Sequence, residues 1–332
     1  MTEPRDGREG RVYLSIVMPM YNEEENVAHT VEQINGALQG QVESYEIVLV
    51  NDGSTDRTLE AAKRLMAADE RVRVIFYVRN GRRGKALRTG LAQAGGRIVA
   101  SIDADLSYSS EIVLEFVRTL QDDPELDMVL ASPYMEGGRV QVVPPMRLLV
   151  SRLGNLVLSA AIAGHIRTST CIVRGYRREV LESLQLGSDG KEIHLEILAK
   201  ALALGYRAKD IPAVLRNRKR GRSKFRSRIT ALSHLVFTFF ETPMLLFGLV
   251  GLMFVLLGLA GGGYIIVLWQ QRALNPERPL MTLTVLLIVT GMQALSFGFI
   301  GTQLVLLRKE IYKVQMQNRQ ATQKLADPGM VN

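Results

Sequence analysis

The sequence predicts an α/β domain with a mostly parallel sheet, followed by an amphipathic helix and a hairpin of two membrane-spanning helices. Three observations lead to this fold class. Apolar segments of strand length alternate with helical patterns over about the first 130 residues, polar clusters follow three of those segments, and two uncharged runs lie nearer the carboxyl end. Strands that alternate with helices are typical of a parallel sheet covered on both faces.

Five segments are expected to form buried strands because they are short and apolar. They are residues 12–18, 45–50, 71–78, 98–102 and 127–132. Helices are expected between them, the first capped by Asn22, the second ending near Ala68, the third over 84–94 and the fourth over 110–120. The inward faces of the first and third helices are predicted to be Val27, Val31, Ile34 and Leu38, and Ala86, Leu87, Gly90, Leu91 and Ala94.

Two long runs near the carboxyl end carry no charge. Residues 242–271 and 279–307 contain 30 and 29 residues without Asp, Glu, Lys or Arg. Each exceeds the ~20 residues that a helix needs to cross a bilayer, which predicts two transmembrane helices. Residues 229–241 place apolar side chains on one helical face, which predicts a helix lying in the membrane interface. Those side chains are Ile229, Leu232, Leu235, Val236, Phe239 and Phe240.

Basic residues give the chain a net charge of +8 and gather before the first uncharged run. Eight lie within 13 residues: Arg216, Arg218, Lys219, Arg220, Arg222, Lys224, Arg226 and Arg228. Such a run is often a solvated tail or a nucleic-acid patch; beside a membrane span, anionic lipid or phosphate is favoured. Basic residues also follow the second run, whereas residues 272–278 hold two, so both termini are expected in the cytoplasm.

The amino end shows no signal-peptide pattern, because its apolar run is short and broken by Ser15 and Pro19. Cys171 is the single cysteine, which excludes an internal disulfide and agrees with a reducing compartment. We therefore expect an integral protein of the inner (cytoplasmic) membrane, with its α/β domain and both termini on the cytoplasmic side.

Three polar clusters follow predicted strands: "PMYNEEEN" from Pro19, "NDGSTD" from Asn51 and "DADLS" from Asp103. Ligands of parallel sheets bind at the carboxyl ends of the strands, so the clusters predict one site. The glycine fingerprint of dinucleotide-binding folds is missing after the first strand, and "GRRGK" lacks the spacing of a phosphate-binding loop. Asp103 and Asp105 fit either a helix-capping turn or a divalent cation beside a phosphorylated substrate.

Together and in this order, the clusters resemble family 2 glycosyltransferases with the GT-A fold, above all dolichol-phosphate mannosyltransferases and bacterial polyprenyl-phosphate glycosyltransferases. The resemblance covers roughly residues 12–230. Further carrying segments are "GGRVQVVPPMRLLVSRLGN", "YRREVLESL", "LEILAKALALGYRAKDIPA" and "RGRSKF". It implies a Rossmann-like GT-A catalytic domain over 1–228, the interfacial helix over 229–241, the transmembrane pair over 242–307 and a cytoplasmic tail over 308–332.

The resemblance also implies roles for individual residues. The nucleotide sugar is expected to contact Pro19, Tyr21, Glu23, Asp52 and Asp103. Mg²⁺ or Mn²⁺ is expected on Asp105 first, with Asp103 and Ser107. The acceptor phosphate or diphosphate is expected on Arg147, Arg152, Arg222, Ser223 and Lys224, of which Arg222 and Lys224 join Asp103 and Asp105 as catalytic residues. Two departures are Ser107, where the mannosyltransferase pattern has Gln, and Pro133, where the family tends to have Arg.

The implied reaction is metal-dependent transfer of a hexose, with inversion, from a nucleotide sugar to a polyprenyl phosphate. Mannose from GDP-mannose is favoured, and glucose from UDP-glucose is the alternative. The phosphate acceptor needs no catalytic base, since its oxygen is already anionic. Two rivals stay open: a polysaccharide synthase, although Trp269 is the only Trp and Gln-x-x-Arg-Trp is absent, and a catalytically dead scaffold. The expected partners are the nucleotide sugar, polyprenyl phosphate and membrane lipids, without nucleic acid; a homo-oligomer stays open.

Overall fold

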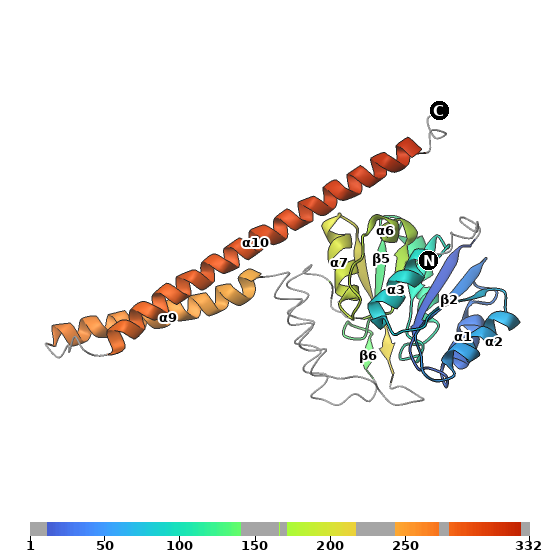
Figure 1. Ribbon diagram of the computed structural model, residues 1–332, viewed down its shortest axis with the longest axis horizontal. Helices are drawn as coiled ribbons and strands as arrows, with labels where there is room; N and C mark the ends of the chain where they lie inside the picture. The colour runs from blue at the N-terminus through green and yellow to red at the C-terminus, as the bar shows by residue number, and fades with distance from the viewer. Residues whose placement is uncertain (1–11, 141–165, 167–170, 217–242, 272–278, 327–332) are drawn as a thin grey trace. The chain divides into compact units, whose positions relative to one another are not determined.

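The computed structural model describes residues 12–140, 166, 171–216, 243–271 and 279–326 (Figure 1). The chain divides into two compact units: Met1–Ser233 with Met316–Asn332, and His234–Gln315. The first unit holds the sheet and the second holds most of two long helices. The predicted domain boundaries at 228, 241 and 307 stay predictions.

Over the described residues, the main sheet has seven strands in the order β3-β2-β1-β4-β7-β5-β8. Their bounds are β1 Leu14–Met20, β2 Tyr45–Asp52, β3 Val72–Tyr77, β4 Ile98–Ser101, β5 Met128–Ser132, β7 Arg174–Arg177 and β8 Ala208–Pro212. Strands β1 to β4 are parallel, and β7 runs antiparallel between β4 and β5. Strands β6 (Arg139–Val140) and β9 (Val214–Leu215) form a separate parallel pair. The prediction of a mostly parallel α/β sheet is confirmed.

Helices cover both faces of the sheet (Figure 1). Their bounds are α1 Val27–Leu38, α2 Thr58–Ala68, α3 Arg82–Gln93, α4 Ile112–Asp122, α6 Arg178–Ser183 and α7 Ile193–Ala203. Helices α1, α2 and α4 share one buried apolar cluster with alternate residues of β1, such as Ile16. Helices α3, α6 and α7 share the other cluster with the opposite face, such as Val17. This two-layer burial supplies the hydrophobic stabilisation of a doubly covered sheet.

The five predicted strands and four predicted helices are all present, with ends displaced by a few residues. The predicted inward face of α1 is buried from Val27 to Leu38, and that of α3 is buried as well. The capping role predicted for Asn22 is wrong. Helix α1 begins at Val27, and Asn22 has a left-handed φ of 54°. Its side chain instead joins the loop after β2, because that loop offers partners across the edge of the sheet.

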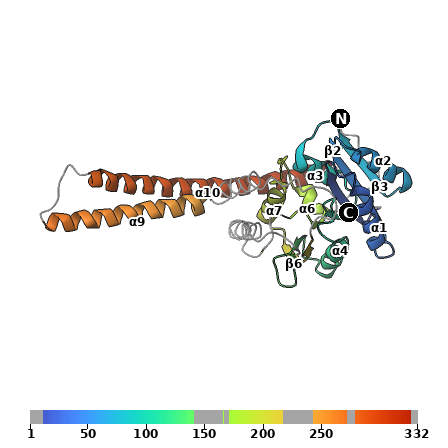
Figure 2. The ribbon, with the colours of Figure 1, turned by 90° about the horizontal axis from the view of Figure 1, so that it is seen from below.

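Helices α9 (Pro243–Gln270) and α10 (Pro279–Ala326) are long and apolar enough to span a membrane by length and composition. They lie side by side (Figures 1 and 2). A Cβ atom added to Gly251 would lie 2.7 Å from the carbonyl oxygen of Gly291, and one added to Gly291 would lie 2.8 Å from that of Gly251. Small residues therefore let the two backbones approach closely, as in many membrane hairpins. The predicted interfacial helix over 229–241 lies outside the described residues.

Candidate active site

The three polar clusters meet at one edge of the sheet because the strands before them are parallel neighbours. Met20 at the end of β1 is paired with Asn51 of β2, and Val17 of β1 with Ser101 of β4. The carboxyl ends of the three strands thus open onto the same side. The topology brings the three clusters to one edge of the sheet, and their forming one binding site stays a prediction.

Hydrogen bonds join the first cluster to the second. The Asn22 backbone N–H donates to Ser54 Oγ at 2.9 Å, and the Thr55 N–H donates to Asn22 Oδ1 at 2.8 Å. The Glu23 N–H donates to Thr58 Oγ1 at 2.7 Å. Each bond crosses between segments more than 30 residues apart, so the loops after β1 and β2 form one connected surface.

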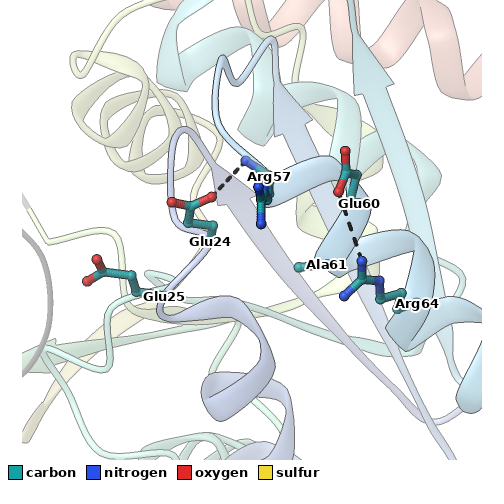
Figure 3. Close-up of a pocket in the computed structure, with 6 residues that line it drawn as sticks. All are labelled: Glu24, Glu25, Arg57, Glu60, Ala61 and Arg64. Atoms are coloured by element: carbon teal, nitrogen blue, oxygen red, sulfur yellow. Dashed lines mark hydrogen bonds and ion pairs between the residues drawn. The ribbon is translucent and has the colours of Figure 1, made fainter.

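A hollow of about 340 Å³ lies beside these loops (Figure 3). Its lining is charged and consists of Glu24, Glu25, Arg57, Glu60, Ala61 and Arg64. Glu24 accepts the Arg57 backbone N–H at 2.8 Å, and Arg64 lies 4.0 Å from Glu60. No residue predicted to bind the nucleotide sugar lines it, so this hollow flanks the candidate site.

Asp52 ends β2 and is 3% exposed. Its Oδ1 atom accepts the backbone N–H of Gly81 at 2.7 Å. Burial raises the pKa of the Asp52 carboxyl, while the Gly81 N–H and the Lys85 charge oppose that shift. The next residue, Gly53, has a φ of 64°, and a Cβ there would lie 2.5 Å from the Asn80 nitrogen. The loop after β2 therefore requires glycine to bring Asp52 against the turn before α3.

The aspartate pair follows β4. Asp105 Oδ1 accepts the N–H of Ser107 at 3.0 Å and its hydroxyl at 2.6 Å. Leu106 between them has a φ of 50°, and the Ala104 carbonyl accepts the buried Thr30 hydroxyl at 2.7 Å. Helix α4 begins only at Ile112 and has no side-chain cap, so the helix-capping alternative is wrong. The turn instead presents Asp105 and Ser107 together.

Two cations from the start of α3 lie at the same edge, and the sequence reasoning missed both. Arg83 Nη2 lies 3.2 Å from Asp103 Oδ1. The Lys85 ammonium lies 4.9 Å from the centre of the Tyr77 ring, and its charge acts on Asp52. The available signal was the position of "GRRGK" directly after β3, the fourth strand whose carboxyl end opens onto this edge.

A divalent cation would find hard oxygen donors here. Among the described residues, no three His, Cys, Asp or Glu side chains gather as a ready-made metal site. The predicted donors are the Asp103 and Asp105 carboxylates and the Ser107 hydroxyl, and so few protein oxygens would suit a cation that keeps water or substrate oxygens in its shell. This donor chemistry fits Mg²⁺ or Mn²⁺.

The remaining predicted residues divide into two groups. Pro19 lies within β1, and Tyr21 and Glu23 follow it at the same edge. The predicted phosphate contacts lie outside the described residues: Arg147, Arg152, Arg222, Ser223 and Lys224.

Known proteins are similar to this chain in sequence. The family model described as glycosyl transferase family 2 matches residues 15–185. A dolichol-phosphate mannosyltransferase of Pyrococcus furiosus is 32% identical over 218 residues, covering 65% of this chain and 60% of that protein. An undecaprenyl-phosphate 4-deoxy-4-formamido-L-arabinose transferase of Salmonella paratyphi A is 28% identical over 295 residues, 87% of this chain and 86% of the relative.

A solved structure shows the same fold. It is glucosyl-3-phosphoglycerate synthase from Mycobacterium tuberculosis in complex with Mn²⁺, UDP and phosphoglyceric acid. It aligns with a TM-score of 0.53 and 22% identity, over 68% of this chain and 78% of the other. The predicted GT-A fold is thus confirmed, and with the family match over more than half of the sequence, the chain belongs to glycosyl transferase family 2.

Proposed function

We propose that this protein transfers a hexose, with inversion, from a nucleotide sugar to a polyprenyl phosphate. The observation that carries the proposal is the meeting of Asp52, Asp103 and Asp105 at one sheet edge, in a chain with two helices long and apolar enough to span a membrane. The match with the mannosyltransferase spans only 60% of that relative's length, so its activity comes to this chain as part of the proposal.

Mannose from GDP-mannose is the favoured donor. Support comes from the "YRREVLESL" and "GRSK" segments and from the Pyrococcus furiosus relative, whose name states mannosyl transfer. A UDP-linked hexose such as UDP-glucose is the alternative. In either case Pro19, Tyr21, Glu23 and Asp52 contact the nucleotide, and Asp103 faces the sugar and nucleotide.

A divalent cation belongs to the proposed site. Asp105, Asp103 and Ser107 would hold Mg²⁺ or Mn²⁺, which supplies positive charge where the diphosphate leaving group becomes more anionic. The chain adds its own cation, since Arg83 lies beside Asp103. The Ser107 hydroxyl and N–H fix the orientation of the Asp105 carboxylate, so it is preorganised before the substrate binds.

The proposed acceptor needs no general base. A lipid phosphate is already anionic near neutral pH, so the site must hold two anionic groups together. Arg147, Arg152, Arg222, Ser223 and Lys224 are proposed to contact phosphate oxygens, and guanidinium groups suit a bidentate grip. Glu196, whose side chain is 11% exposed, accepts backbone N–H groups of a neighbouring loop with both carboxylate oxygens, so this carboxylate has a structural role.

The proposed test is a screen of nucleotide sugars against undecaprenyl phosphate and dolichyl phosphate, with products identified by mass. We expect one hexose on the lipid phosphate, from GDP-mannose or a UDP-hexose. Undecaprenol without phosphate is the matched acceptor control and is expected to stay unmodified. Glycosylation of the free alcohol would contradict the acceptor, a growing polymer would indicate a polysaccharide synthase, and no transfer from any donor would indicate a dead scaffold.

A further inference from the structure

The loop over residues 185–190 is held by α7 through one buried carboxylate. Glu196 is 11% exposed, and it accepts the Gly187 N–H at 2.9 Å through Oε1 and the Ser188 N–H at 2.8 Å through Oε2. Lys200 Nζ lies 2.6 Å from Oε1. Burial acts to raise the pKa of Glu196, but the Lys200 and loop hydrogen bonds outweigh it and the pKa is lowered. The carboxylate is therefore charged, which strengthens its hydrogen bonds to the loop N–H groups.

The same loop contacts the first turn of α3. The Asp189 carbonyl accepts the Gly84 N–H at 2.8 Å and the Lys85 N–H at 3.3 Å. The Gly84 N–H is a first-turn amide, which lacks a partner within its own helix. Arg88 donates to the Leu186 carbonyl at 2.9 Å and to Asp189 Oδ1 at 2.6 Å. The loop thus caps α3 from a segment about 100 residues away.

The contact leaves no room for a side chain at Gly84. A Cβ there would lie 2.5 Å from the Asp189 carbonyl carbon and from the Gly190 oxygen. Both neighbours are backbone atoms that a rotamer change cannot move. The position of α3 is therefore set directly by the loop.

The first turn of α3 is also where the helix touches the candidate site. Gly81 donates to Asp52 at 2.7 Å, and Arg83 lies 3.2 Å from Asp103. Arg82 between them has a φ of 72°, a conformation that non-glycine residues adopt only when their surroundings fix it. A shift of this turn would move the partners of both aspartates at once.

We propose that Glu196 is a positioning residue for nucleotide-sugar binding. Through loop 185–190 it fixes the start of α3, and so the contacts of Asp52 and Arg83 with the site. The inference rests on the proposed function, because it requires a nucleotide at this edge. It assigns Glu196 a role different from that of a catalytic base.

The test measures binding as well as turnover. UDP and GDP with Mg²⁺ are titrated calorimetrically into the full-length protein, wild type and Glu196→Ala, Glu196→Gln and Gly84→Ala variants. Of UDP and GDP, we expect the one that wild type binds more tightly to bind ~10-fold more weakly to Glu196→Ala and Gly84→Ala. The reason is that a shift of ~1 Å in a supporting segment is costly even when that segment lies away from the reacting atoms. Glu196→Gln keeps one acceptor oxygen but places its amide NH2 group, which is a donor, against a loop N–H, so we expect an intermediate loss.

Two further readouts separate positioning from general damage. Hydrogen exchange in residues 81–88 should accelerate, and the KM for the donor should rise while the KM for polyprenyl phosphate stays within about 2-fold. The matched control is Glu182→Ala, which removes a carboxylate paired with Arg178 at 2.7 Å on α6; it should bind nucleotide like wild type. If Glu196→Ala fails to fold, Gly84→Ala and Arg88→Ala give the same comparison.

Each contrary outcome has a distinct meaning. If Glu196→Ala and Gly84→Ala bind the nucleotide with the same affinity as wild type, the positioning role is overturned and the proposed function is unaffected. Equal rises in both KM values would show a merely structural role and would overturn it too. A wild-type protein that binds neither UDP nor GDP would overturn the proposed function, and this inference with it.

Discussion

The orientation of the Asp105 carboxylate is fixed by Ser107, two residues further along the chain. Its Oδ1 atom accepts both the N–H and the hydroxyl of Ser107. Replacing Asp105 by Asn keeps an oxygen for those donors but removes the charge that a cation needs. We expect Asp105→Asn to lower turnover ~10²- to 10³-fold, because charge stabilisation in such sites carries several kcal/mol. Transfer of radiolabelled hexose to lipid phosphate measures it.

Removal of metal should reproduce that loss in the wild-type protein. EDTA is expected to abolish transfer, and excess Mg²⁺ or Mn²⁺ to restore it. Thermal unfolding of Asp105→Asn should match wild type, since the turn stays hydrogen-bonded. Full activity in EDTA would refute the metal requirement.

The sequence alone predicted that Asp52, Asp103 and Asp105 lie at one edge of the sheet, because they follow apolar segments and parallel strands end at one edge. It did not locate Arg83 or Lys85. Their place depends on how closely α3 approaches the sheet, and a Cβ at Gly90 would lie 2.4 Å from Val17 Cγ1. The distance between α3 and the sheet depends on side-chain packing, and the spacing of residues in the sequence does not predict it.

At the scale of elements, an ion pair fixes the joint between α2 and β3. Asp69 follows α2, and its side chain is 17% exposed. Its carboxylate accepts hydrogen bonds from Arg71 Nε at 2.8 Å and from Asn35 Nδ2 at 2.9 Å. The Arg71 hydrogen bond lowers the pKa of Asp69 below its usual 3.8. Because the folded pKa is depressed, the pair stabilises the fold above pH 3.8 and loses that effect as pH falls through the lowered pKa.

We therefore expect Asp69→Asn to cost ~1–2 kcal/mol of stability at pH 7, as for hydrogen bonds to charged groups. The difference from wild type should be constant above pH about 5 and should shrink below pH 3.8, where the wild-type carboxylate takes up a proton. Thermal unfolding followed by circular dichroism measures it. The exposed Asp122→Asn is the control and should match wild type at every pH; an equal deficit at pH 7 and pH 3 would contradict the assignment.

Strand β7 shows why one element escaped prediction. Its four residues, "RGYR", carry two arginines and no run of apolar side chains. Arg174 is nevertheless fully buried, because its guanidinium donates to the carbonyls of Cys171 at 2.7 Å and His194 at 2.6 Å. A buried arginine whose donors are satisfied by carbonyls outside its own strand has a local sequence typical of a surface turn.

At the scale of the whole molecule, the basic residues on either side of the two apolar helices predict the orientation in the membrane. Both termini are expected in the cytoplasm and residues 272–278 outside. A cysteine placed at Asn275 should react with an impermeant maleimide in intact cells, or in spheroplasts where an outer membrane intervenes. A cysteine placed at Asn318 should react only after lysis.

The native thiol suits this experiment. Cys171 is 8% exposed, and burial raises its pKa to about 11, so it is a poor nucleophile near neutral pH. The unmodified protein therefore serves as the unlabelled control. Reaction at residue 275 only after lysis would reverse the predicted topology.

The strand order also sets the sequence in which the sheet is completed on the ribosome. Strands β3, β2, β1 and β4 are contiguous in the sheet, and all have been synthesised by residue 101. Among the described strands, β5 pairs with β7 and β8, and β7 is translated about 40 residues after β5 ends. A nascent chain can thus assemble β2, which ends at Asp52, and β4, which Asp103 follows, early, while both edges of β5 are still unpaired. At a synthesis rate of ~5–20 residues per second, this interval lasts a few seconds. We expect chaperones at the ribosome to bind β5 during that time.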